Sequence, residues 1–193
     1  ENFLEPMINL YDENKNVGAV GAIQYNYYDR EKIEVIYNRQ NPFTLKNLRF
    51  NKLPQNFVKK YIETSYVEGA CFLTGKDVIE KVGLLCEDYF LYWEELDLCA
   101  RMRKMGYKPL VSLEAKIWHK IMESTKKNPD NQIYFYIRNK FIYAKRNMGT
   151  AKRNIFYLSI LSYLPFYLFA YLRGKRKLTP VIKAYIDGFR YKK

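Results

Sequence analysis

Cysteine and histidine are scarce in this sequence. Of 193 residues only three are cysteines, Cys71, Cys86 and Cys99, and one is a histidine, His119. Cysteines this far apart form neither a disulfide framework nor the closely spaced pairs of a zinc site, so we expect a reducing compartment. Internal repeats and low-complexity tracts are absent, which excludes solenoids and fibrous proteins. The first residues lack the pattern of a secretory leader, and because the chain opens on Glu1 rather than Met, we expect it to be part of a longer protein.

Acidic residues are almost missing from the C-terminal end. The whole chain has 33 Lys and Arg against 20 Asp and Glu, a net charge of +13. Residues 145–193 contain twelve of these cations and a single acid, Asp187, whereas residues 1–144 are nearly neutral at +2. A cationic end of this kind requires an anionic partner, either phospholipid headgroups or nucleic acid.

An uncharged run of 18 residues, Ile155 to Leu172, decides between these partners. A nucleic-acid-binding arm needs no such run, so we predict a membrane segment and no nucleic-acid partner. As a helix it would rise about 27 Å, slightly less than a hydrocarbon core of roughly 30 Å. Basic residues flank both ends, and Pro165 interrupts the middle. We therefore predict a helical pair, bent at Pro165, that lies in or re-enters an anionic membrane surface from the cytoplasmic side. The alternative is a set of buried helices in a soluble core.

The first 147 residues have the pattern of an α/β domain. Apolar residues recur at helical spacing from Phe3 to Tyr11. The remaining elements we expect are a buried strand at Val17–Ile23, an irregular loop over 38–53, a second buried strand at Tyr66–Thr74, helices at Lys76–Val82 and Glu94–Met105, and a strand at Tyr107–Ser112. Gly69 and Ala70 lie at the centre of the second strand, where a glycine marks either a bulge or the close approach of a ligand. In the tail, we expect Thr179 to cap a last helix.

The densest chemistry lies in the sequence DYFLYWEELD, residues 88–97. Its carboxylates Glu94, Glu95 and Asp97 are at the start of a helix, where backbone N–H groups and the macrodipole favour negative charge. That is a sufficient structural reason for them. The aromatic residues just before them would also desolvate a carboxylate partly, which raises its pKa toward a value useful for a general base. Both interpretations stay open on the residues alone.

The run from Val67 to His119 resembles the second half of family 2 glycosyltransferases, particularly rhamnosyltransferase-like and galactofuranosyltransferase-like members. The shared features are, in order, a G-A-C strand, a helix ending in V-G, the sequence YFLYWEELDLCAR, a G-Y and a strand ending at a histidine. The helix and strand at the start of the chain and the helix YFYIRNKFIYAKRN, residues 134–147, extend the resemblance to roughly 150 of the 193 residues.

The resemblance implies part of a GT-A fold, a Rossmann-like and mostly parallel sheet flanked by helices. It implies an inverting transfer of a sugar from a nucleotide-sugar donor to a lipid-linked or cell-surface saccharide acceptor. A divalent cation, Mg²⁺ or Mn²⁺, would neutralise the leaving diphosphate. In the family, the acidic metal ligands and the nucleotide-binding strands precede the helix that opens this chain. We therefore expect residues 1–147 to be the C-terminal portion of the catalytic domain, residues 148–193 to be the membrane-associated tail, and the 193 residues alone to be inactive.

The resemblance also assigns roles to single residues. By its position in the motif Glu95 is the catalytic base, where the family usually has Asp, while Glu94 and Asp97 orient the acceptor and the helix. Trp93 would stack against a sugar, with core packing as the alternative. His119 would complete the cation site or meet the diphosphate. The remaining substrate-binding residues are Arg138, expected on phosphate oxygens, and Gly69 and Ala70. Cys86 departs from the Asp that commonly occupies its position.

Two other classes of function remain possible on the sequence. The first is a non-catalytic module that binds the membrane surface and has a glycosyltransferase-like fold. The second is a nucleic-acid binder that uses the basic tail, which the uncharged run argues against. For the transferase, the tail and its flanking charges predict a position at the cytoplasmic face of the plasma membrane, and the resemblance implies a bacterial cell-envelope enzyme.

Overall fold

The structure is a computed structural model that describes residues 2–120, 128–174 and 177–192. The chain forms two compact units. The first unit comprises Glu1–Gln40, Asn47–Leu85 and Glu95–Ile121, and the second unit comprises Asn41–Lys46, Cys86–Glu94 and Met122–Lys193. The division at residues 147 and 148 that the sequence suggested stays a prediction.

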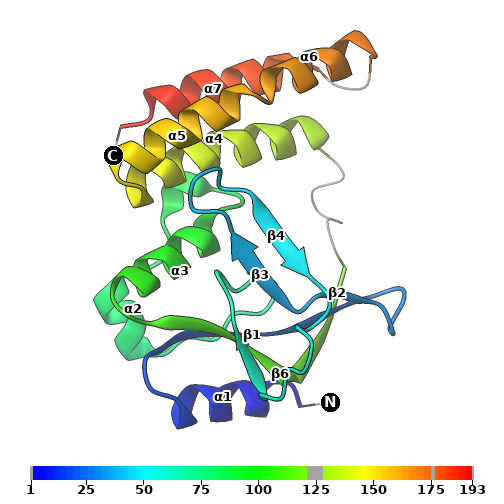
Figure 1. Cartoon of the computed structure of the whole chain (residues 1–193), viewed down its shortest axis with the longest axis vertical. Helices are drawn as coiled ribbons and strands as arrows, with labels where there is room; N and C mark the ends of the chain where they lie inside the picture. The colour runs from blue at the N-terminus through cyan, green and yellow to red at the C-terminus, as the bar shows by residue number, and fades with distance from the viewer. Residues whose placement is uncertain (1, 121–127, 175–176, 193) are drawn as a thin grey trace. The chain divides into compact units, whose positions relative to one another are not determined.

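A four-stranded sheet forms the centre of the first unit (Figure 1). Its strands are β2 (Ile33–Val35), β1 (Val17–Asn26), β6 (Lys108–His119) and β5 (Tyr61–Glu63), in that spatial order. The long strands β1 and β6 run parallel, from Val17 opposite Lys108 to Asn26 opposite His119. The two outer pairings are antiparallel, so the sheet is mixed. The α/β class is confirmed.

Helices cover both faces of this sheet because neighbouring residues of β1 point to opposite sides. On one face Val20 and Ala22 pack with α1 (Leu4–Glu13), which contributes Met7 and Leu10. On the other face Ala19 packs with residues of α2 (Lys76–Val82) and α3 (Glu94–Lys104). The apolar spacing thus correctly predicted α1, α2 and α3, and it predicted both β1 and β6 but ended each strand too early.

The segment 38–53 is a β-hairpin rather than the irregular loop we predicted. Strand β3 (Tyr37–Gln40) pairs antiparallel with β4 (Asn47–Phe50), and the rings of Tyr37 and Phe50 stack with their centroids 4.7 Å apart. The side chain of Asn41 accepts hydrogen bonds from the N–H groups of Phe43 and Thr44, both at 2.9 Å, which closes the turn. The prediction was wrong because this hairpin is mostly polar and lacks an apolar period.

The prediction of a second buried strand at Tyr66–Thr74 is also wrong, because the segment does not form a strand. Of this segment only Leu73 pairs with the sheet, through two backbone hydrogen bonds to Val20 of 2.8 and 3.0 Å. Gly69 and Ala70 form an exposed turn in which the N–H of Cys71 bonds to the carbonyl of Glu68 at 3.2 Å. The glycine thus lies in a turn rather than in a strand bulge, and the approach of a ligand to it stays a prediction.

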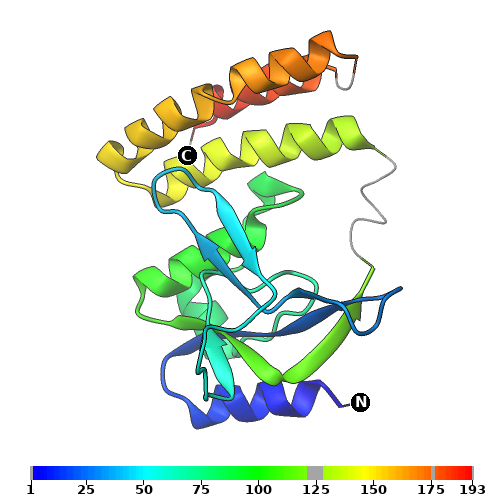
Figure 2. The ribbon, with the colours of Figure 1, turned by 45° about the vertical axis from the view of Figure 1, so that its right-hand side comes forward.

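Four helices make up most of the second unit: α4 (Pro129–Asn147), α5 (Thr150–Leu161), α6 (Leu164–Leu172) and α7 (Thr179–Arg190). Helices α4, α5 and α7 lie side by side in both views (Figures 1 and 2). Phe141 of α4 is fully buried against the rings of Phe156, Tyr185 and Phe189. The cap of α7 is Leu178, one position before the Thr179 that we expected, so Thr179 is the first helical residue.

The segment Thr150–Leu172 is long and apolar enough to cross a membrane by length and composition alone, and only 17% of its most apolar window is buried. The helix breaks at Ser162 and Tyr163, where the Ser162 hydroxyl bonds to the carbonyl of Ser159 at 2.6 Å. Pro165 therefore lies in the first turn of α6, where proline is tolerated, and the bend precedes it. Membrane association itself stays a prediction.

Candidate active site

Glu95, the predicted base, lies in the first turn of α3 and is half-buried. The charge of its carboxylate contributes to the raised pKa values of two buried groups in the first unit, Tyr66 and Cys99. Burial together with nearby acids that include Glu95 raises the pKa of the Tyr66 phenol, and burial raises the pKa of the Cys99 thiol to about 12 with a smaller contribution from Glu95. The carboxylate of Glu95 thus interacts electrostatically with the phenol of Tyr66, a residue that is only 4% exposed.

Arg49 and Glu68 complete this group, which we call the Tyr66 cluster (Arg49, Tyr66, Glu68 and Glu95). The guanidinium of Arg49 forms a bidentate ion pair with the carboxylate of Glu68. Its two contacts, Nε to Oε1 and Nη2 to Oε2, are both 3.0 Å long. Arg49 also hydrogen-bonds with the phenol of Tyr66. A bidentate pair of this kind fixes the geometry of both side chains.

A small cavity of about 10 Å³ borders the same cluster at Glu68. Its other polar lining residues are the buried side chains Gln24 and Asn38. Within the described part of the chain, Asn38 Oδ1 has no hydrogen-bond donor. A space of this size accommodates one water molecule and no sugar.

The loop before α3 has an unusual backbone. Phe90, Tyr92 and Trp93 have φ angles of 60°, 64° and 79°, in the left-handed region that bulky residues rarely adopt. The cause is the buried amide of Asn139 on α4, which donates to the carbonyls of Tyr89, Leu91 and Tyr92 at 2.8, 2.6 and 2.9 Å. Since an amide nitrogen has two hydrogens, one of these is shared. Our sequence reasoning gave Asn139 no role, although it follows Arg138 in the helix that we compared with the family.

Arg138 supports the same loop. Its Nη2 donates to the carbonyls of Asp88 and Tyr89 at 2.5 and 3.0 Å, and its Nε donates to Asn139 Oδ1 at 2.9 Å. The guanidinium also lies 4.9 Å from the ring centroid of Phe135. These donors hold protein atoms in this structure, so the phosphate contact expected for Arg138 stays a prediction.

Trp93 is packed in the core, which is the alternative we considered for it. The indole is 1% exposed, and its centroid lies 5.3 Å from the ring of Tyr143 and 6.1 Å from that of Tyr136. A sugar cannot reach a face that these rings cover. The next residue, Glu94, is half-buried, and its Oε2 has no hydrogen-bond donor among the residues that the structure describes.

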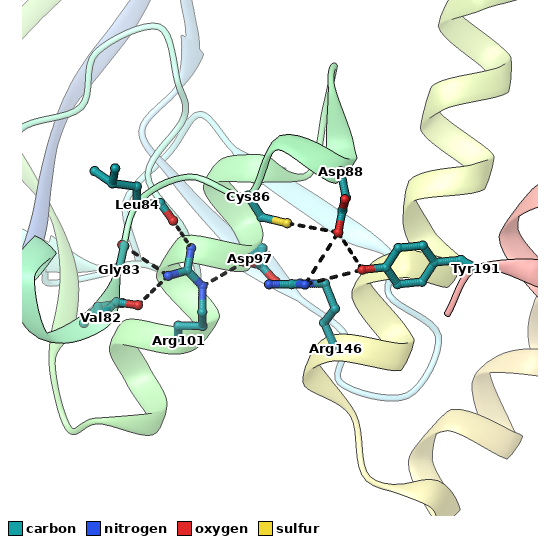
Figure 3. Close-up of polar contacts among 9 residues, drawn as sticks. All are labelled: Val82, Gly83, Leu84, Cys86, Asp88, Asp97, Arg101, Arg146 and Tyr191. Atoms are coloured by element: carbon teal, nitrogen blue, oxygen red, sulfur yellow. Dashed lines mark hydrogen bonds and ion pairs between the residues drawn. The ribbon is translucent and has the colours of Figure 1, made fainter. Parts of the chain in front are cut away.

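Asp97 has a structural partner. Its carboxylate is fully buried and accepts from Nε of Arg101, one helical turn on, at 2.8 Å (Figure 3). The rest of the Arg101 guanidinium donates to the backbone carbonyls of Val82, Gly83 and Leu84. The pair therefore joins α3 to the end of α2.

Asp88 is the centre of a separate polar group in the second unit (Figure 3). Its Oδ2 accepts from the phenol of Tyr191 at 2.7 Å and from the Cys86 thiol at 3.5 Å, and lies 3.7 Å from Nη1 of Arg146. The bond from Tyr191 is the largest cause of the lowered pKa of Asp88. This group ties the short helix η1 (Glu87–Tyr89) to residues of α4 and to the residue after α7.

His119 is the last residue of β6, and its Nδ1 is buried without a hydrogen-bond partner in the described ranges. Across those ranges no group of three or more His, Cys, Asp or Glu side chains is placed to hold a metal ion. His119 alone does not make a cation site, so its role as a ligand stays a prediction. The predicted substrate residues Gly69 and Ala70 are exposed.

No family model matches the chain. Two curated proteins resemble part of it. The low-salt glycan biosynthesis hexosyltransferase Agl10 of Haloferax volcanii is 28% identical over 81 residues, which is 40% of this chain and 25% of that enzyme. The N-acetylglucosaminyl-diphospho-decaprenol L-rhamnosyltransferase of Mycobacterium tuberculosis is 28% identical over 85 residues, 44% of this chain and 28% of the enzyme.

Among solved structures, GalNAc-T7 with UDP, GalNAc and Mn²⁺ aligns with 72% of this chain and 32% of its own, at a TM-score of 0.46 and 12% identity.

The two sequence matches span about a quarter of the length of the curated relatives. They agree with the resemblance seen in the motifs: the chain is a relative of the glycosyltransferases.

Proposed function

We propose that this chain provides the acceptor side of an inverting glycosyltransferase, which moves a sugar from a nucleotide-sugar donor to a lipid-linked or cell-surface saccharide. The two curated relatives are named for hexosyl and rhamnosyl transfer, and the second is named for a lipid diphosphate acceptor. The observation that carries the proposal is the position of Glu95 at the start of α3, within the Tyr66 cluster.

Two carboxylates of this region are held in ion pairs with arginines. Glu68 is bound to Arg49 and Asp97 to Arg101, so both have a structural role. Glu95, half-buried at the helix start, is the carboxylate that the family motif places at the base position. We therefore assign the proton transfer to Glu95.

In the proposed reaction the carboxylate of Glu95 takes the proton of an acceptor hydroxyl. The hydroxyl oxygen forms a bond to C1 of the donor sugar, and the bond from C1 to the diphosphate oxygen breaks with its electron pair on the leaving nucleoside diphosphate. Attack opposite the leaving group inverts C1. The loop held by Asn139 and Arg138 would fix the start of α3, because a misplaced base loses much of its rate.

A divalent cation belongs to the proposal only through the resemblance. It would neutralise charge on the leaving diphosphate. The described residues do not assemble a ligand set for it, so no step of the reaction is derived through the metal.

We further propose that α5 and α6 hold the enzyme at the cytoplasmic face of the plasma membrane. Large apolar side chains are exposed on these helices: Leu158 and Leu172 are 72% exposed and Phe166 is 63% exposed. Arg153 and Arg173 flank the run, and cationic flanks favour an anionic lipid surface.

The test uses membranes that contain the complete gene product that includes these 193 residues. Nucleotide release is measured with UDP-, dTDP- and GDP-sugars. We expect Glu95→Gln to lower release at least about 100-fold, since it removes the general base. Glu87→Gln is the matched control, because Glu87 is exposed on η1 and has no role in the proposal. Equal release by Glu95→Gln and wild type would contradict the assignment.

The exposed apolar side chains of α5 and α6 also favour a second candidate, a non-catalytic module that binds the membrane surface. This module would bind anionic vesicles and release no nucleotide with any donor. Glu95→Gln would then change nothing beyond stability.

A further inference from the structure

A second cavity, of about 330 Å³, lies in the first unit. Five parts of the chain line it: the turn between α1 and β1, β3, the segment leading into β5, β5 itself, and the start of β6. The lining residues are Asn14, Lys15, Arg39, Pro54, Phe57, Lys59, Tyr61, Ile62, Glu63, Lys108 and Leu110. None of them belongs to the Tyr66 cluster, so this cavity is independent of the proposed transfer reaction.

The charge of this cavity is strongly positive. Lys15, Arg39, Lys59 and Lys108 line it with a single acid, Glu63. Within the ranges that the structure describes, none of the four cations forms an ion pair or a side-chain hydrogen bond to a carboxylate. Four like charges around one space repel one another, and an anion in the cavity would relieve that repulsion.

The size and the apolar lining limit the ligand. A volume of 330 Å³ is at the small end of sites for small molecules, which fits a single sugar-sized ring. Phe57 and Tyr61 provide rings against which a sugar face can pack, and the buried residues Ile62 and Leu110 lie beside them. Lys59 also lies 6.0 Å from the centroid of Tyr61, which places a cation beside that ring.

We propose that this cavity binds a phosphate-bearing ligand of the size of a sugar phosphate. Phosphate carries up to two negative charges and three free oxygens, and it can therefore satisfy several of the four cations, whereas a carboxylate can satisfy fewer. Arg39 can hold phosphate through two donors, and the lysines act as point charges. The carboxylate of Glu63 accepts hydrogen bonds from sugar hydroxyls, but it repels a bare anion.

The proposal therefore predicts an order of affinity: glucose 1-phosphate binds more tightly than inorganic phosphate, and glucose does not bind. Each ligand is titrated at low salt into the 193-residue chain in neutral detergent, and binding is followed by calorimetry and by the rise in melting temperature. Lys59→Ala and Lys108→Ala should each weaken glucose 1-phosphate about five- to tenfold, the loss expected for one charged contact. Both side chains are exposed, so the fold should tolerate these changes.

Lys81→Ala is the matched control, because it removes the same charge from an exposed position of α2 that does not line the cavity. Glu63→Gln should bring the affinities for inorganic phosphate and glucose 1-phosphate closer together. No binding of glucose 1-phosphate below about 10 mM, an affinity too weak for a built site, would overturn the proposal. Equal weakening by Lys81→Ala would also overturn it, since binding would then follow net charge alone.

Phosphatidylinositol vesicles distinguish a lipid headgroup from a soluble sugar phosphate. If the ligand is a lipid, Lys59→Ala and Lys108→Ala weaken vesicle binding as much as they weaken glucose 1-phosphate. If it is soluble, they leave vesicle binding unchanged. Both results differ from the nucleotide-release test, because neither depends on Glu95.

Discussion

Lys140 is half-buried beside two aromatic rings of the second unit, and replacing it with methionine tests what its positive charge costs. Its ammonium lies 4.7 Å from the ring centroid of Tyr136 and 5.8 Å from that of Tyr163. Burial lowers the pKa of Lys140 from 10.5 to about 8. At neutral pH this difference corresponds to a cost of about 3 kcal/mol for holding the charged form in the folded chain. The two ring contacts offset about 1 kcal/mol of it.

We therefore expect Lys140→Met to raise the free energy of unfolding by about 2 kcal/mol at pH 7. The sign of the pH dependence follows from the lowered pKa. Above pH 8 the folded chain has lost a proton that the unfolded chain keeps up to about pH 10.5, so the wild type gains stability as pH rises through this interval. The advantage of the variant should thus fall by about 2 kcal/mol between pH 7 and pH 9.5.

Urea denaturation of both proteins in neutral detergent at pH 7 and 9.5 measures this difference. Lys183→Met is the matched control: Lys183 is exposed on α7 and lies 5.4 Å from the ring of Tyr134, so its removal should change stability by less than about 0.5 kcal/mol. Loss of stability in Lys140→Met at pH 7, or a gain that is the same at both pH values, would refute the reasoning.

Three further substitutions test contacts within the second unit. Asn139→Ala should lower the free energy of unfolding by about 3 kcal/mol in urea denaturation, because it leaves carbonyls of the loop before α3 without donors. Gly188→Ala should cost about 1 to 3 kcal/mol in the same assay, since a Cβ there would lie 2.6 Å from Cδ2 of Phe141. Tyr191→Phe should destabilise the protein at neutral pH. Its effect should disappear as pH falls through the lowered pKa of Asp88, because the bond from Tyr191 favours the ionised carboxyl, which is lost there; thermal melts across pH measure this.

Elements with a strong apolar period could be predicted from the sequence. Helix α2 occupies Lys76–Val82 as predicted, and β1 begins at Val17 as predicted, because each presents a regular apolar pattern to the core. The hairpin of β3 and β4 has no such pattern, since the hydrogen bonds of Asn41 and a single stacked ring pair define it. The segment at Tyr66–Thr74 has a strand-like composition, but its glycine turn leaves only Leu73 paired.

The candidate site was predictable only in part. The sequence identified the acidic start of α3 and hence Glu95. It did not identify Arg49, because that residue lies 46 positions before Glu95 in a segment that we took for a loop, and only the fold brings the two into one cluster. Arg138 was singled out for its charge, whereas the neutral Asn139 beside it makes more contacts with the loop.

The close packing of α4 against α7 bears on how a soluble version of this protein should be engineered. Truncation after Asn147 would remove the basic tail, but it would also expose Phe141, which the tail residues Phe156, Tyr185 and Phe189 cover. Helix α4 would then expose a new apolar surface around Phe141, which favours aggregation. Exchanging exposed apolar side chains of α6, such as Phe166 and Leu172, for polar ones keeps that cover and reduces the exposed apolar surface.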